Sequence, residues 1–249
     1  TKIIPIDSEH FSIFKLLENH KLNEINKIYI TASGGPFLNT KKRLLNKVGP
    51  KEALKHPKWK MGKKISIDSS TMMNKILELA EASKLFNIPI NKLDIIIHPE
   101  SLVHAIIEFK NGLIKMIYHE TSMIIPLANA IFNNDIDINL FYKKNHKKIK
   151  NLTFVNIDRK KFPTVNLKNK ICEYPSSAII INAANEVLVD QFLQKKIPFL
   201  GIFKFIMTTL KDRNYKNYAI RKPNNINQIY KIDYWAKNLT LRKIKTKYE

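Results

Sequence analysis

The hydrophobic pattern of the chain changes near residue 133, and this change constrains the fold more than any other feature of the sequence. Before it, short runs rich in β-branched residues alternate with helix-like segments. Two of these runs, 103–109 and 113–118, flank Asn111-Gly112, a dipeptide typical of a tight hairpin turn. The first half is therefore predicted to form an α/β (α+β) domain with a mixed sheet.

Three further strands are expected in this half, at 25–31, 65–67 and 93–97. Asp68 or Ser69, directly after the middle run, is a residue type that begins helices, so a helix is predicted to follow it. We expect Ser69 to lie at the N-terminus of that helix, where free amides favour an anion.

The second half of the chain has a helical pattern. Residues 133–158 are polar and irregular and predict a linker with at most one short strand. Amphipathic helices are expected at 176–194, 199–210 and 225–243. The predicted organisation is a domain at 1–132, the linker at 133–158 and a small helical bundle at 159–249.

Composition narrows the class of protein. The chain of 249 residues has one cysteine, Cys172, which excludes an internal disulfide and suits a reducing compartment. It has neither an apolar run of roughly 18 residues nor a signal peptide, so we expect a cytoplasmic protein without a membrane partner. Its net charge of +22 raises the alternative of a basic nucleic-acid-binding protein. The basic residues are spread along the chain without a nucleic-acid motif, so no nucleic-acid partner is predicted.

Three carboxylates are candidates for a divalent cation. In an extended segment, Asp7 and Glu9 would point to the same side and face one ion. An isolated pair of this kind is more often a surface acidic turn. Glu78 is the third candidate, and its helix is expected to place Asn74, Lys75 and Thr71 on the same face. The alternative for that face is an ordinary solvated surface.

Several polar residues suit a phosphate. Ser33 and the two glycines after it follow a predicted strand, in a turn that could bring backbone amides to an anion, although such a turn is also common. Residues 56–64 combine Trp59 and Met61 with basic residues and predict a mobile loop over an anionic ligand. An exposed loop with a locally packed tryptophan is the alternative.

Together, these motifs resemble the 1-deoxy-D-xylulose 5-phosphate reductoisomerase family over nearly the whole chain, in order and with consistent spacing. The matching segments are 5–10, 31–37, 56–62, 64–75, 97–101 and 182–186. Glu100 replaces the glutamine usual in its motif, and residues 120–123 depart from the family pattern. The resemblance also implies a preceding dinucleotide-binding domain that this sequence does not contain. We therefore expect part of a longer enzyme, lacking most of the NADPH site.

The resemblance implies NADPH-dependent conversion of 1-deoxy-D-xylulose 5-phosphate to 2-C-methyl-D-erythritol 4-phosphate in the non-mevalonate isoprenoid pathway, by a homodimer. It implies a catalytic domain at 1–132, in which Asp7, Glu9 and Glu78 hold Mg²⁺, Mn²⁺ or Co²⁺. It also implies that Gly62 approaches the NADPH cofactor. The small phosphorylated sugar substrate would be bound by Glu9, Glu78, Ser8, Ser33, His56, Ser69, Asn74 and Lys75. The alternative is an inactive remnant that binds metal and phosphate without redox chemistry.

Overall fold

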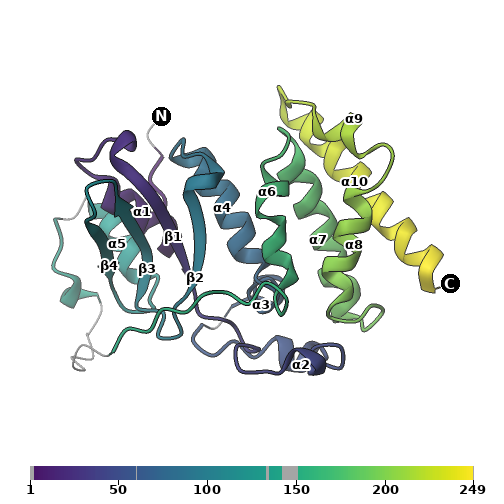
Figure 1. The fold of residues 1–249 in the computed structure, drawn as a ribbon, viewed down its shortest axis with the longest axis horizontal. Coiled ribbons are helices and arrows are strands. Elements are labelled where there is room, and N and C mark those ends of the chain that lie inside the picture. Colours follow the sequence, from purple (N-terminus) through teal and green to yellow (C-terminus); the bar gives the residue numbers. More distant parts are fainter. Residues whose placement is uncertain (1–2, 60, 133–134, 142–150, 249) are drawn as a thin grey trace. The chain divides into compact units, whose positions relative to one another are not determined.

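The computed structural model of the chain describes residues 3–59, 61–132, 135–141 and 151–248. Its α-helices and strands are shown in Figure 1. The strands are β1 (Ile25–Ala32), β2 (Leu93–Ile97), β3 (Val103–Phe109) and β4 (Ile114–Tyr118). The helices of the first half are α1 (Ser8–Leu17), α2 (Pro50–Ala53), α3 (Lys63–Thr71), α4 (Met73–Leu85) and α5 (Ile124–Phe132). Those of the second half are α6 (Lys168–Ile171), α7 (Ser177–Leu193), α8 (Gly201–Leu210), α9 (Tyr215–Ala219) and α10 (Ile226–Tyr248).

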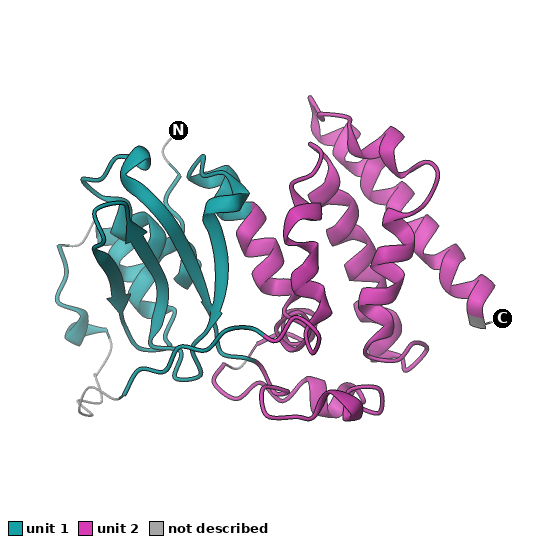
Figure 2. Ribbon diagram, in the orientation of Figure 1, with its two compact units in different colours: residues 1–34, 81–157 teal, residues 35–80, 158–249 magenta. Residues whose placement is uncertain are grey.

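The chain divides into two compact units (Figure 2). Unit 1 contains residues 1–34 and 81–157, and unit 2 contains residues 35–80 and 158–249. The units interleave along the chain, whereas the predicted domains are consecutive. The division at 132 and 158 stays a prediction, and parts of the predicted linker lie outside the described residues.

Unit 1 is built on a mixed sheet with the strand order β2-β1-β3-β4. β1 pairs in parallel with β2 and antiparallel with β3, and β3 pairs antiparallel with β4. α1 packs against β3 and β4. Alternate residues of β1, such as Ile28 and Ile30, are completely buried. The predicted mixed sheet is confirmed, as is the hairpin, in which Gly112 adopts the positive φ of 86° that favours glycine.

Unit 2 contains the helices of the second half together with α2, α3 and residues 73–80 of α4. α7 lies centrally and packs against α8, α10 and α3. A buried cluster that includes Ile180, Ile232 and Ala236 joins α7 to α10. The three helices predicted for the second half are confirmed within a few residues. No helix among the described residues is long and apolar enough to cross a membrane; the cytoplasmic location stays a prediction.

The strand predicted at 65–67 is wrong, because these residues form part of α3. The alternation of Ile65, Ser66 and Ile67 is too short to separate strand from helix. In the helix, Lys64 lies four residues before Asp68, and their charged groups pair at 2.8 Å. The predicted helix start at Asp68 or Ser69 is wrong for the same reason. α3 begins after Gly62, and a left-handed residue, Met72, separates it from α4.

Candidate functional site

The acidic motif lies at the N-terminus of α1. Asp7 is the N-cap residue, and its Oδ1 accepts hydrogen bonds from the backbone amides of Glu9 and His10, each at 3.1 Å. The expected extended conformation is therefore wrong, because an aspartate here satisfies amides that have no partner inside the helix. Glu9 lies in the first turn and accepts a hydrogen bond of 2.5 Å from the buried Ser8 hydroxyl.

The third carboxylate, Glu78, is buried on α4. Its two oxygens accept hydrogen bonds from Lys75 Nζ at 2.8 and 3.0 Å, and Oε1 also accepts one from Asn74. These three residues share a helix face, as predicted. Thr71 does not belong to it, because it ends α3, where its hydroxyl donates to backbone carbonyls of its own helix.

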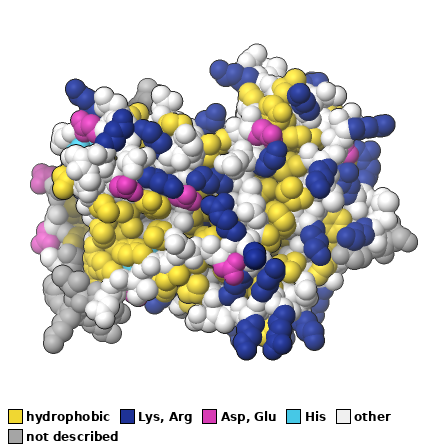
Figure 3. All heavy atoms as spheres, viewed as in Figure 1, with side chains coloured by type: hydrophobic (Ala, Val, Ile, Leu, Met, Phe, Trp, Pro, Cys, Tyr) yellow, Lys and Arg dark blue, Asp and Glu magenta, His cyan; other side chains and the backbone are white. Residues whose placement is uncertain are grey.

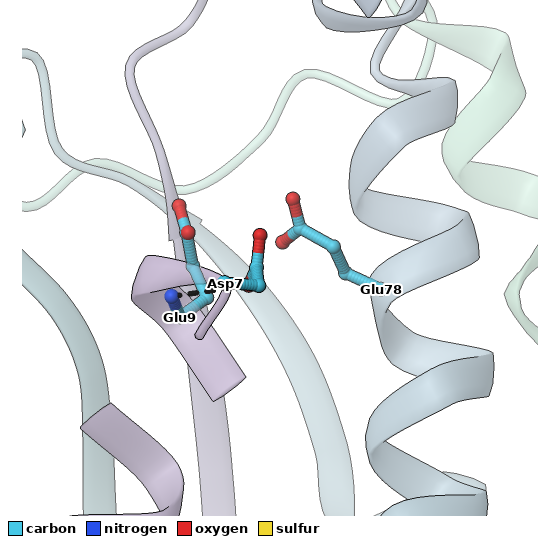
Figure 4. A group of neighbouring side chains, drawn as sticks. All are labelled: Asp7, Glu9 and Glu78. Atoms are coloured by element: carbon cyan, nitrogen blue, oxygen red, sulfur yellow. Dashed lines mark hydrogen bonds between the residues drawn. The ribbon is translucent and has the colours of Figure 1, made fainter. Parts of the chain in front are cut away.

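Asp7, Glu9 and Glu78 come together in space (Figure 4). One carboxylate oxygen from each lies within 4.8 Å of the other two. α4 is a single helix whose end belongs to unit 1, where Glu81 approaches His10 of α1 with Oε2 3.8 Å from Nδ1. Glu78 lies one turn before Glu81 on this helix, so the helix itself brings its carboxylate towards the start of α1.

The donor set of this cluster fits a hard divalent cation. All three side chains offer oxygen, which Mg²⁺ and related ions prefer. Ligand oxygens about 2.1 Å from an octahedral ion lie about 3 Å apart when adjacent and about 4.2 Å apart when opposite. The three carboxylate oxygens lie within 4.8 Å of one another, so small movements of the side chains would bring them to three ligand positions around one ion.

The residues predicted to bind phosphate lie on several elements. Ser69 occupies the last turn of α3, so its predicted position at a helix N-terminus is wrong. Gly35, with φ of 62°, packs against that turn, and a Cβ on it would lie 3.1 Å from the Ser69 carbonyl oxygen. Ser33 directly follows β1 in unit 1.

The segment before α3 contains the two remaining predicted residues. The His56 ring accepts hydrogen bonds from the amides of Lys58 and Trp59 at 3.2 and 2.9 Å. Burial, and then the charge of Lys75, lower the pKa of His56, which places this imidazole in the electrostatic field of Lys75. Gly62 is the N-cap residue of α3, and no atom lies within 4 Å of where its Cβ would be.

Sequence reasoning missed two buried polar groups. The first is the buried His104, which stacks on His119 with ring centroids 4.0 Å apart. Burial lowers the pKa of His119, and the Glu120 carbonyl and the charge of Glu9 oppose that effect. The second group pairs Asp68 with Asn185 of α7 at 2.7 Å. Burial raises the pKa of Asp68, opposed by Lys64 and Asn185. The 182–186 motif was the available signal for this pair.

Comparison with known proteins gives the same family for both parts of the chain. Residues 3–86 match the 1-deoxy-D-xylulose 5-phosphate reductoisomerase C-terminal domain, and residues 119–239 match the DXP reductoisomerase C-terminal domain. The 1-deoxy-D-xylulose 5-phosphate reductoisomerase of Pelagibacter ubique is 44% identical over 94% of this chain and 60% of its own length. The chain thus spans about three fifths of the curated relative's length.

Solved structures of the family have the same fold. A DOX-P reductoisomerase in complex with NADPH, fosmidomycin and magnesium superposes with a TM-score of 0.88 at 31% identity, covering 98% of this chain and 64% of that one. The Zymomonas mobilis enzyme in complex with NADPH gives a TM-score of 0.83 at 33% identity, covering 96% and 61%. On these matches of sequence and fold, the chain belongs to the 1-deoxy-D-xylulose 5-phosphate reductoisomerase family.

Proposed function

We propose that this chain supplies the metal and substrate sites for NADPH-dependent conversion of 1-deoxy-D-xylulose 5-phosphate to 2-C-methyl-D-erythritol 4-phosphate. The observation that carries the proposal is the meeting of Asp7, Glu9 and Glu78 in a chain of this family. These three carboxylates would hold the ion. A related structure contains magnesium, and the oxygen-only donor set extends the proposal to Mn²⁺ and Co²⁺.

In this proposal, the bound divalent ion polarises substrate oxygens as a Lewis acid, and NADPH supplies the hydride. The protein's own contribution is positioning. Lys75, which pairs with Glu78 at 2.8 Å, carries the positive charge best placed to meet a phosphate beside the cluster. Asn74 lies next to it on α4 and adds an amide donor.

The other substrate contacts come from neighbouring segments. Ser8 begins α1 beside the carboxylates, and Ser33 follows β1. Ser69 lies in the last turn of α3. The charge of Lys75 on α4 contributes to the lowered pKa of His56 in the segment before α3. Hydroxyl, amide, imidazole and ammonium donors of this kind hold a phosphate and orient the carbons that react. The open space around Gly62 suits a close approach of the nicotinamide cofactor.

Calorimetric titration with Mn²⁺ and fosmidomycin tests the proposed site in this chain. We expect one Mn²⁺ site, and fosmidomycin binding that depends on the metal. Lys75→Met should weaken fosmidomycin binding while keeping the metal site, because Lys75 is proposed to contact the phosphate rather than the ion. Equal Mn²⁺ binding by Glu9→Gln and the unmodified chain would contradict the proposed ligand set.

A separate assay tests catalysis. The product of the whole reading frame should oxidise NADPH with 1-deoxy-D-xylulose 5-phosphate in the presence of Mg²⁺. Binding of metal and fosmidomycin without this turnover would favour the inactive, ligand-binding remnant.

We also propose a homodimer that forms at the open edge of the sheet. β4 pairs with β3 on one side, and three of its side chains, Ile114, Met116 and Tyr118, are 42% to 60% exposed. Figure 3 shows hydrophobic side chains gathered over this side of unit 1. An apolar edge strand of this kind favours pairing with a second copy. Light scattering after gel filtration should give a dimer, and Met116→Lys should shift it towards the monomer; an unchanged dimer would place the interface elsewhere.

A further inference from the structure

A buried polar link joins α3 to α7 inside unit 2. Asn185 of α7 is completely buried, and its Nδ2 donates to Asp68 Oδ1 at 2.7 Å. Asp68, only 1% exposed, pairs through its other oxygen with Lys64 Nζ at 2.8 Å. Glu186, next to Asn185 in sequence, pairs with Lys237 of α10 at 2.7 Å. Polar side chains thus connect α3 to α7, and α7 in turn to α10.

This polar link stabilises the contact between α3 and α7 less than apolar packing would. Asn185 Oδ1 is buried and has no hydrogen-bond partner among the described residues. An unsatisfied buried polar atom destabilises the folded state, and a buried carboxylate adds the cost of its own desolvation. Apolar side chains would pack the same α3–α7 contact without either cost. The hydrogen bond from the Asn185 amide has a defined geometry, which apolar packing lacks, and it therefore fixes the position of the Asp68 carboxylate.

The carboxylate directly precedes Ser69, in the last turn of α3. That turn also packs against Gly35, where a Cβ would lie 3.1 Å from the Ser69 carbonyl oxygen and 3.3 Å from the Ser70 Cα, both closer than ordinary van der Waals contact. The Ser69 carbonyl accepts the amide of Met72, where the chain leaves α3 with a positive φ of 66°. The turn is therefore fixed in two ways, by the loop that contains Gly35 and by the Asn185–Asp68 link.

We infer that Asn185 is a positioning residue for the substrate's phosphate: acting through Asp68, it holds the last turn of α3 so that Ser69 presents its hydroxyl to that group. The inference rests on the proposed function, because it takes Ser69 as a phosphate contact. It assigns a role to the 182–186 motif that the metal cluster does not require.

The test is a binding comparison between the unmodified chain and Asn185→Leu with three probes. Fosmidomycin carries a phosphonate and a metal-chelating hydroxamate, acetohydroxamic acid carries only the chelating group, and Mn²⁺ alone reports the carboxylate cluster. We expect the dissociation constant of fosmidomycin to rise about tenfold, which corresponds to about 1.4 kcal/mol. Those of Mn²⁺ and acetohydroxamic acid should change less than about twofold. Gln191→Leu makes a comparable amide-to-leucine change on α7 and should leave all three unchanged.

A double-mutant cycle separates positioning from a general loss of structure. In a Ser69→Ala background, Asn185→Leu should add less than about a twofold effect, because its route to the phosphate has been removed. Full additivity, or equal weakening of fosmidomycin and acetohydroxamic acid, would overturn the inference. If Asn185→Leu does not fold, Asn185→Ser replaces it, with a hydroxyl too short to reach Asp68. Failure of the unmodified chain to bind fosmidomycin would instead contradict the proposed function.

Discussion

Neutralising Glu78 should leave the stability of the metal-free protein almost unchanged, because its repulsion by the other two carboxylates and its attraction to Lys75 are of similar size. Glu78→Gln keeps the shape of the side chain and an Oε1 that can still accept from Asn74. With the effective dielectric of about 20 that suits a buried group, two like charges 4.8 Å apart repel by about 3.5 kcal/mol, and Glu78 faces two of them. Its attraction to Lys75 at 2.8 Å is worth about 6 kcal/mol on the same basis. The relieved repulsion and the lost attraction nearly cancel, so we expect a change of about 1 kcal/mol or less.

In contrast to the stability of the metal-free protein, the stabilisation that Mn²⁺ adds should depend strongly on Glu78. At a Mn²⁺ concentration of 100 times the dissociation constant, binding to the folded state adds about 2.7 kcal/mol, a rise of about 5–11 °C in Tm for a chain of this size. Glu78→Gln should lose most of this rise in a thermal unfolding assay with and without Mn²⁺. The matched control is Glu18→Gln, which removes an exposed carboxylate paired with Lys15 at the end of α1 and should keep the whole rise. A full rise in Glu78→Gln would refute the three-carboxylate site, and its loss in both variants would indicate non-specific binding to acidic residues.

Three further changes test other parts of the structure. Asp7→Asn should keep the helix cap and lose Mn²⁺ affinity in a titration, whereas Asp7→Ala should also lower the free energy of unfolding in urea by about 1 kcal/mol. Because burial lowers the pKa of His119, the unfolded chain takes up a proton before the folded one as the pH falls below 6.5. Urea unfolding at pH 7.5 and 5.5 should therefore show a smaller pH-dependent loss of stability in His119→Asn than in the unmodified chain. Asn87→Ala, at an exposed position with φ of 52°, should destabilise by about 1 kcal/mol in urea, and Asn87→Gly should not.

The strands and the long helices were predictable because their signals are local. The run 25–31 is rich in isoleucine and its alternate residues are buried, and Asn111-Gly112 supplies the backbone conformation that a tight hairpin requires. Likewise, α7, α8 and α10 are long enough for helical periodicity to be clear. In each case, the residues that specify the element lie within it.

The wrong predictions share a cause. The local sequence is compatible with more than one structure, and a contact with a residue far away in the sequence determines which one forms. The 65–67 run is helical because α3 packs against α7, more than a hundred residues later, through Asp68 and Asn185. Nothing within the run itself indicates that contact. The same applies to Asn185, whose importance depends on a carboxylate that the sequence places far away.

The acidic motif shows why the start of a helix, rather than an extended segment, is the better base for the carboxylate cluster. Three carboxylates within 4.8 Å repel one another, so the site needs positive charge nearby even before a cation binds. At the start of α1, the first backbone amides and the helix dipole supply part of it, and Asp7 accepts two of those amides directly. Lys75 supplies the rest from α4. An extended Asp-x-Glu segment would align the two side chains but would lack the helix dipole, and thus the N-cap position of Asp7 both orients the motif and offsets its charge.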